Sequence, residues 1–421
     1  MIKDVSLESL LWPLSVETFV SEIWANRDYV LKRNDADYFT GLIDVATIEQ
    51  YLEYGRPDRS GVRLIKRDDK GESDSYRFAD GGIDSVSIRN KFVEGYTVVL
   101  NGLERYLPKM AAVSRAIEAE LGFETQVNAY ITPPHSQGFL PHYDDHDVLV
   151  LQIEGAKTWL VYDSLPLVPT HELRLRDLFA REELPAPREL ILEAGDLLYL
   201  PRGRVHAAKA MVEPSIHLTL GIHPPSVLEL ISKAVEALGY RDDRVLASLP
   251  PRYAKDASVR TKLGELVREV TVAIDERSIG DGIGALEDRV VRRGRCSLAG
   301  QLVANSFAAA MIDEDTSVFK SQPLYARVLG INEGVALQFG ESLVEASSDH
   351  MAAMLFLAKA TEPFQVGQLP GLSAAQQIEL ARKLVIDGFL IRIPRADKNG
   401  QEYELVEREQ PASYATDRAG D

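Results

Sequence analysis

The feature that most constrains the fold is a run of short strand-like segments between residues 126 and 222. Each segment is rich in β-branched or aromatic residues, and glycine, proline or charge separates it from the next. The segments are QVNAYIT (126–132), VLVLQI (148–153), KTWLVY (157–162), ELILEA (189–194), DLLYLP (196–201), VHAAKA (205–210) and SIHLTLGI (215–222). So many short strands in one stretch predict a closed barrel or a sandwich of two sheets.

Helices are expected on both sides of this strand-rich region. Before it, a helix is predicted to begin at Ser15, and a second one to run from Pro108 to Leu121 and end at Gly122. Directly after it, Ser226 and Glu229 form a capping box at the start of an amphipathic segment that ends at Gly239. A further apolar stripe begins at Ser258. Two consecutive amphipathic helices need another surface to cover them.

The C-terminal part combines helices and strands again. From Ser348 the pattern predicts a helix, a short strand FQV (364–366), a helix begun by a capping box of Ser373 and Gln376, and a strand FLIRI (389–393). That order resembles a winged helix. Residues 410–421 are expected to form a disordered tail.

Composition narrows the class of protein. The chain has 421 residues, a formal net charge of −17 and one cysteine, Cys296. Its apolar runs are far shorter than the roughly 20 residues of a membrane-spanning helix, and its N-terminus lacks a secretory pattern. A single cysteine excludes a disulfide framework and suits a reducing cytosol. The acidic balance opposes binding to phosphate backbones and favours cationic partners. We therefore expect a soluble, cytoplasmic protein of two or three domains.

Three residues have the spacing of a metal site. His142 and Asp144 are two apart where a strand meets a turn, so their side chains can point to one face. By itself this pair is common in exposed turns. The stretch GDLLYLPRGRVH fits the spacing G-x5-P-x-G-x2-H of a second cupin motif and ends in His206. Two histidines and one carboxylate would form the facial triad of a non-haem Fe(II) oxygenase.

At these residues the sequence resembles a known family. NAYITPPHSQGFLPHYDDHDVLVLQIEGAKTWLVY, YLPRGRVH and HLTLG are similar to the JmjC ribosomal oxygenases, and the likeness extends over nearly the whole chain. It implies an α+β protein whose core is a double-stranded β-helix (a cupin or jelly roll). The implied domains are a JmjC catalytic domain with an N-terminal helical segment (1–225), a helical dimerisation domain (226–300), a winged helix (301–409) and the tail (410–421).

The resemblance also implies a reaction. Lys157 matches the lysine that pairs with the distal carboxylate of 2-oxoglutarate, and Asn128 and Tyr130 match polar residues that line the same pocket. The implied reaction uses Fe(II), 2-oxoglutarate and O2 to hydroxylate an arginine or histidine side chain of a ribosomal protein, which is a basic partner. The implied assembly is a homodimer built through the helices at 226–239 and 258–275. His135 and His146 depart from the family pattern.

Other conspicuous residues favour ordinary roles. Asp145 and Asp147 are interpreted as solvated acids of a turn, although they could also touch substrate. His217 is interpreted as a satisfied core histidine or as a neighbour of the ligands. Cys296 is interpreted as incidental. The remaining histidines have no spacing that demands a role: His171, His223 and His350.

Two other functions also fit the sequence. One is the same chemistry on a peptide natural product or a free amino acid, since a fold does not fix a substrate. The other is a non-enzymatic regulator, in which the winged helix binds DNA and the cupin senses a ligand. Against specific DNA binding, the expected recognition helix has only Arg382 and Lys383 as cations, beside Glu379. We expect no membrane partner.

Overall fold

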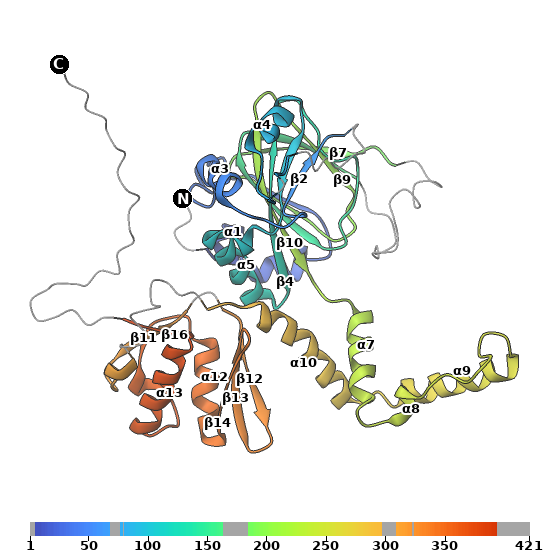
Figure 1. Cartoon of the computed structure of the whole chain (residues 1–421), viewed down its shortest axis with the longest axis vertical. Coiled ribbons are helices and arrows are strands. Elements are labelled where there is room, and N and C mark those ends of the chain that lie inside the picture. Colours follow the sequence, from blue (N-terminus) through green and yellow to red (C-terminus); the bar gives the residue numbers. More distant parts are fainter. Residues whose placement is uncertain are drawn as a thin grey trace, which may run out of the picture. The chain divides into compact units, whose positions relative to one another are not determined.

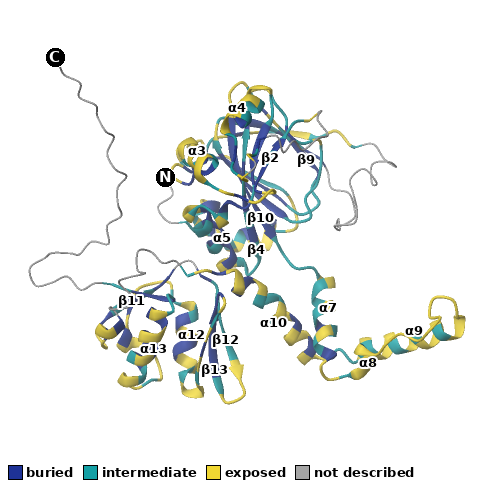
Figure 2. Cartoon of the chain, viewed as in Figure 1, coloured by how far each residue is buried: buried dark blue, intermediate teal, exposed yellow. Residues whose placement is uncertain are grey.

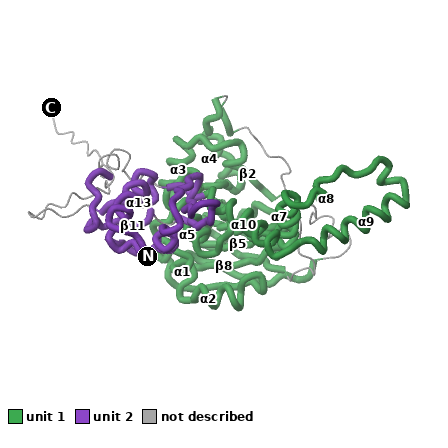
Figure 3. Tube along the Cα trace, turned by 90° about the horizontal axis from the view of Figure 1, so that it is seen from below, with its two compact units in different colours: residues 1–293 green, residues 294–421 purple. Residues whose placement is uncertain are grey.

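The computed structural model describes residues 5–67, 76–78, 80–162, 184–296, 309–321 and 324–393. Contacts divide the chain into two compact units, residues 1–293 and residues 294–421 (Figure 3). The division that we expect at 225/226 therefore falls inside the first unit. The expected tail, residues 410–421, lies outside the described residues.

The first unit contains two antiparallel sheets that face each other (Figure 1). The larger sheet has seven strands in the order β1-β8-β5-β10-β4-β3-β2, and the smaller has three in the order β7-β6-β9. The strands are β1 (Tyr29–Leu31), β2 (Val62–Ile65), β3 (Thr97–Leu100), β4 (Glu124–Thr132), β5 (Asp147–Glu154), β6 (Ala156–Val161), β7 (Arg188–Glu193), β8 (Leu197–Leu200), β9 (His206–Ala210) and β10 (Ser215–His223). All seven predicted strands are confirmed. The two sheets form the double-stranded β-helix that the sequence predicts.

Helices pack against the outer face of the larger sheet, so its central strands are buried on both faces. Along β5, Leu149 and Leu151 face the helices, whereas Val148 and Val150 face the smaller sheet. Neighbouring residues of a strand point to opposite faces. Side chains on the same face as Val148 therefore point into the space between the two sheets.

The helical elements of this unit surround the sheets and continue beyond them. They are α1 (Leu7–Leu11), α2 (Val16–Thr18), the π-helical turn η1 (Phe19–Ile23), α3 (Val45–Tyr54), α4 (Ser85–Val93), the 3₁₀ turn η2 (Leu103–Arg105), α5 (Pro108–Leu121), α7 (Val227–Leu238), α8 (Asp243–Leu246), α9 (Ala257–Val272) and α10 (Glu276–Arg293). The helix predicted at Ser15 does begin there, with the Ser15 hydroxyl accepting from the Thr18 N–H at 3.1 Å. Gly122 ends α5 in the left-handed conformation, as expected.

The structure corrects the interpretation of Asp147. Asp147 is not a solvated turn residue, because it begins β5 and is only 2% exposed. The Tyr199 hydroxyl donates to its carboxylate at 2.5 Å and accepts from the Ala25 N–H at 2.8 Å. Burial raises the pKa of Asp147. This carboxylate therefore anchors the N-terminal segment to the larger sheet.

The helices after the sheets leave much apolar surface uncovered. The capping box of Ser226 and Glu229 is confirmed at α7, and α9 begins after Asp256, which caps it in place of the predicted start at Ser258. The sequence did not predict α10, which packs against α7; a Cβ atom at Gly282 would lie 2.9 Å from the backbone nitrogen of Ala234. No residue of α9 is buried (Figure 2).

The second unit has its own core around Phe339 and Phe389. It contains the sheets β15-β11-β16 and β12-β13-β14. Its elements are η3 (Ala309–Met311), β11 (Ser317–Lys320), β12 (Ala326–Ile331), β13 (Gly334–Phe339), β14 (Ser342–Ser347), η4 (Ser348–His350), α12 (Met351–Lys359), β15 (Phe364–Gln365), η5 (Val366–Gln368), α13 (Ala374–Ile386) and β16 (Leu390–Arg392). The helices and strands predicted from Ser348 onward are confirmed, including the capping box of α13. The sequence missed strands β11 to β14.

Candidate active site

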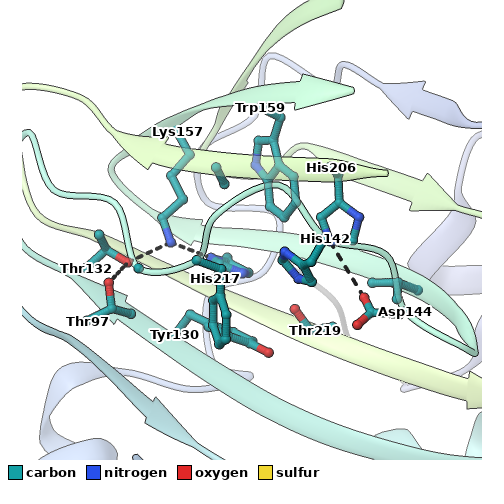
Figure 4. A pocket seen from close by; sticks show the side chains of 14 residues that line it. Thr97, Tyr130, Thr132, His142, Asp144, Lys157, Trp159, His206, His217 and Thr219 are labelled. Carbon is teal, nitrogen blue, oxygen red and sulfur yellow. Dashed lines mark hydrogen bonds and ion pairs between the residues drawn. The ribbon is translucent and has the colours of Figure 1, made fainter. Parts of the chain in front are cut away.

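A cavity lies between the two sheets of the first unit, and both sheets contribute side chains to it (Figure 4). The alternation along each strand decides which residues reach it, because the intervening residues face away from the cavity. The cavity is lined by Thr97, Tyr130, Thr132, Gly138, Phe139, His142, Asp144, Val148, Lys157, Trp159, His206, Ala208, His217 and Thr219. Polar groups therefore gather in an otherwise apolar interior.

Three of these residues come together as the sequence predicts. One ligand atom each of His142, Asp144 and His206 lies within 4.8 Å of the others. Backbone hydrogen bonds fix this arrangement, because His142 and His206 exchange N–H to carbonyl bonds of 3.0 and 2.8 Å. The Asp144 carbonyl accepts from the Gly203 N–H at 2.9 Å. The glycine turn of the second motif thus binds the segment that carries the first motif.

A hydrogen bond to the backbone orients each of the two imidazole rings, those of His142 and His206. Each ring presents Nδ1 to a backbone carbonyl at 2.9 Å, that of Leu140 for His142 and that of Arg204 for His206. A proton on Nδ1 leaves Nε2 free to bind a metal. Burial, followed by the proximity of His142, lowers the pKa of His206 to about 4, so this ring is neutral at neutral pH.

This set of donors fits a divalent transition metal. Two neutral imidazoles and one carboxylate on one side of an ion are the ligands of non-haem Fe(II) sites, and they leave positions open for other molecules. Within the described residues, this is the one cluster of three or more possible metal ligands.

A buried cation lies at another part of the same cavity. Lys157 is 2% exposed, and its ammonium donates to Thr132 Oγ1 at 2.8 Å and contacts His217 Nδ1 at 2.8 Å (Figure 4). Burial lowers the pKa of Lys157 from 10.5 to about 7. Among the described residues no carboxylate forms an ion pair with it. The cavity therefore offers a partly charged donor that lacks an anionic partner.

Tyr130 and Asn128 are the two other residues that the resemblance places in the co-substrate pocket, and they lie in different positions. Tyr130 lines the cavity, and burial raises its pKa. Asn128 does not line the cavity; its Oδ1 accepts from the Gly102 N–H at 3.0 Å and from Gln126 Nε2 at 3.1 Å. The expected contact of Asn128 with a bound ligand remains a prediction.

Sequence reasoning missed several residues of the cavity. Thr97 and Thr132 hydrogen bond to each other at 3.2 Å, and Thr132 supports Lys157. Trp159 is 4% exposed, and its indole N–H has no partner among the described residues. The available signal was alternation, since Trp159 is two residues after Lys157 on β6.

His135 and His146, the two histidines that depart from the family pattern, do not line the cavity, and neither does His223. The rings of His146 and His223 stack at a centroid distance of 4.4 Å, and His146 Nδ1 contacts Asp145 at 3.1 Å. His135 has a positive φ of 55° in the loop after β4. None of the three touches the metal cluster by a hydrogen bond that the structure shows.

Comparisons with known proteins show which family this chain resembles. A family model described as "JmjC domain" matches residues 103–230. The chain is 33% identical over 229 residues to the bifunctional lysine-specific demethylase and histidyl-hydroxylase NO66 of Drosophila mojavensis, a match of 52% of this chain and 24% of that protein. It is 30% identical over 290 residues to ribosomal oxygenase 2 of Rattus norvegicus, a match of 64% of this chain and 60% of that protein. The chain thus spans between about a quarter and three fifths of these curated relatives.

A solved structure confirms the fold. The Escherichia coli ribosomal oxygenase YcfD in complex with cobalt and 2-oxoglutarate superposes with a TM-score of 0.55 at 18% identity, over 90% of this chain and 98% of that one. A second YcfD structure gives a TM-score of 0.54 at 19% identity over the same shares. The solved structures thus support the fold, and the family model and the curated relatives confirm the resemblance proposed from the sequence over 52–64% of this chain.

The cluster of His142, Asp144 and His206 generates the first prediction. Replacing Asp144 or His206 with Ala should weaken Mn(II) binding at least tenfold, because a three-ligand site loses one of its donors. Calorimetric titration of the metal-free protein measures this, with circular dichroism to verify folding. Asp145→Ala, which removes a neighbouring acid outside the cluster, is the matched control. Equal binding by Asp144→Ala and the control would exclude the cluster as the site.

The depressed pKa of Lys157 generates a second prediction. Below pH 7 the amine is mostly cationic and above pH 7 mostly neutral, so the affinity of the metal-free protein for succinate should be constant at lower pH and fall up to about tenfold per unit above pH 7. Lys157→Met should bind succinate weakly at every pH. Calorimetry between pH 6 and 9 checks both, and a wild-type affinity that does not change from pH 7 to 9 would contradict the assignment.

Proposed function

We propose that this chain, a JmjC-domain protein related to the ribosomal oxygenases, is an Fe(II)- and 2-oxoglutarate-dependent oxygenase that hydroxylates an arginine or histidine side chain of a ribosomal protein. One observation carries the proposal. A cluster of metal ligands and a buried lysine that lacks an anionic partner line the same cavity. A short dicarboxylate with a 2-oxo group has one end that chelates a metal and another that needs a cation.

Different residues of the cavity would bind the metal and the co-substrate. His142, Asp144 and His206 would hold Fe(II), and Lys157 would bind the distal carboxylate of 2-oxoglutarate, with Tyr130 beside it. When bound, Fe(II) and 2-oxoglutarate would supply the oxidation, in which one atom of O2 enters a C–H bond of the substrate and the other enters the co-substrate, which leaves as succinate and CO2. The apolar lining, including Phe139 and Val148, keeps water from the reacting groups.

The charge of the chain supports a basic protein as substrate. A net charge of −17 attracts cationic partners and speeds their encounter. Ribosomal proteins are basic, and the curated relatives include ribosomal oxygenase 2 and a histidyl-hydroxylase. The histidyl-hydroxylase among those relatives supports a histidine target, and arginine is the other target that the resemblance of the sequence implies.

Mass spectrometry tests the proposed function. The enzyme is incubated with Fe(II), 2-oxoglutarate and ribosomal proteins of its own source, and the expected result is the gain of one oxygen atom on a single arginine or histidine. Asp144→Ala should abolish the gain. Succinate formed only with a free amino acid or a small peptide would instead support the alternative in which the same chemistry acts on a small substrate.

The structure does not favour the DNA-binding alternative. On α13, Arg382 donates to the Ile312 carbonyl at 3.1 Å, and Lys383 pairs with Asp387 at 2.9 Å. Both cations of the expected recognition helix therefore already have partners within the second unit. We retain the winged helix as our interpretation of that unit, without specific DNA binding.

We also propose a cytoplasmic homodimer formed through the helices that follow the sheets. Exposed apolar side chains gather there: Val227, Leu228, Ile231, Tyr240, Leu246, Leu249, Tyr253, Val267, Val272, Ile279 and Ile283. A second copy of the chain would cover such a surface through a twofold interface. The single cysteine suits the cytoplasm. Within the described residues, no helix is long and apolar enough to cross a membrane.

This assembly generates a prediction. The wild-type chain should be a dimer at micromolar concentration by light scattering, and the double variant Leu228→Asp/Val267→Asp should be monomeric, because a buried carboxylate disrupts an apolar interface. Val93→Asp, at an exposed apolar position of α4, is the matched control and should remain dimeric. A monomeric wild-type protein would contradict the proposal.

A further inference from the structure

His217 lies on the cavity face of β10 and is 4% exposed. Its pairing with β4 places it directly opposite Tyr130, and the two rings are parallel, with a centroid distance of 4.7 Å and an interplanar angle of 1°. Directly opposed residues of neighbouring strands are the pairs that interact most closely in a sheet. The stack holds the imidazole in a fixed plane.

The Nδ1 atom of His217 points at Lys157. The distance from Lys157 Nζ to His217 Nδ1 is 2.8 Å (Figure 4). Burial, followed by the charge of Lys157, holds the pKa of His217 well below its ordinary value, so the ring is neutral. An ammonium group has only donors, and the contact therefore requires Nδ1 to accept and the ring proton to be on Nε2.

The ammonium of Lys157 thus has two fixed acceptors, Thr132 Oγ1 and His217 Nδ1, each at 2.8 Å. Lysine has three N–H donors on a flexible stem, and its ammonium is a point charge without a preferred direction. Two acceptors held by different strands leave one donor and determine where it points. Thr132 and His217 belong to β4 and β10, which face β6 across the cavity.

We propose that His217 is a positioning residue that holds the Lys157 ammonium toward the distal carboxylate of the co-substrate; this rests on the proposed function above. His217 does not contact the reacting atoms in this role. It makes a flexible cation directional, which lowers the entropy lost when the dicarboxylate binds. Replacing His217 should therefore weaken co-substrate binding and leave the chemical step largely unchanged once the site is saturated.

Two substitutions separate the acceptor from the ring. His217→Phe keeps an aromatic ring for stacking on Tyr130 and removes the acceptor, whereas His217→Asn keeps an acceptor near the position of Nδ1 and removes the ring. We expect His217→Phe to raise the KM for 2-oxoglutarate about tenfold with kcat changed less than about twofold, because an oriented hydrogen bond to a charged group is lost. His217→Asn should restore most of the affinity. A purely structural role for the ring predicts the reverse order.

Binding without turnover gives an independent readout. Calorimetry with the Ni(II)-loaded protein should show the same loss for 2-oxoglutarate in His217→Phe, but little change for 2-oxobutyrate, which lacks the distal carboxylate. In a Lys157→Met background, His217→Phe should have no further effect, since the residue acts through the lysine. His223, the other histidine of β10, is partly buried and does not line the cavity, so His223→Asn is the matched control and should bind 2-oxoglutarate like the wild type.

The outcomes separate the inference from the function on which it rests. If the wild-type protein binds and consumes no 2-oxoglutarate, the proposed function is wrong and the role of His217 falls with it. If the wild-type protein binds it and His217→Phe binds it equally well, only the positioning role is wrong. Equal losses for 2-oxoglutarate and 2-oxobutyrate would likewise overturn the positioning role, because the defect would not involve the distal carboxylate.

Discussion

The burial of one lysine cation explains much of how the cavity is arranged. A charge removed from water is costly unless hydrogen bonds or a counter-charge compensate for it. Lys157 has the hydroxyl of Thr132 and the imidazole of His217, and Thr97 in turn supports Thr132. These neutral acceptors satisfy two of its donors and supply no negative charge. The fall in the pKa of Lys157 to about 7 is the remaining cost, and an anionic ligand would remove it.

Backbone hydrogen bonds hold the proposed metal ligands in place. His142 and His206 are far apart in the sequence, and two backbone hydrogen bonds join them directly. Backbone pairing positions a side chain more rigidly than a loop does, so the site needs few further contacts to stay ordered. The Nδ1 contacts of both rings with backbone carbonyls then select the tautomer. The two sheets thus hold the three proposed metal ligands and a buried lysine within one cavity.

The sequence predicted the parts of this arrangement that depend on local spacing. The triad followed from two motifs, and the strands followed from β-branched residues bounded by glycine and proline. Contacts between distant strands were not predictable in the same way. His217 is buried and has a partner, as interpreted, but its sequence position does not reveal that the partner is Lys157 on the opposite sheet. Asp147 looked like a turn acid because its sequence position does not reveal the contact with Tyr199. Asn128 is two residues before Tyr130 on the same face of β4, yet its amide oxygen accepts from the N–H of Gly102 in the turn after β3.

The central claim is that one dicarboxylate bridges the metal cluster and Lys157. A crystal structure of the protein with Mn(II) and 2-oxoglutarate tests it most directly. The account predicts a metal bound by His142, Asp144 and His206, and a distal carboxylate within hydrogen-bonding distance of Lys157 Nζ. A 2-oxoglutarate molecule bound outside the cavity between the sheets, or one whose distal carboxylate contacts a different cation, would contradict it.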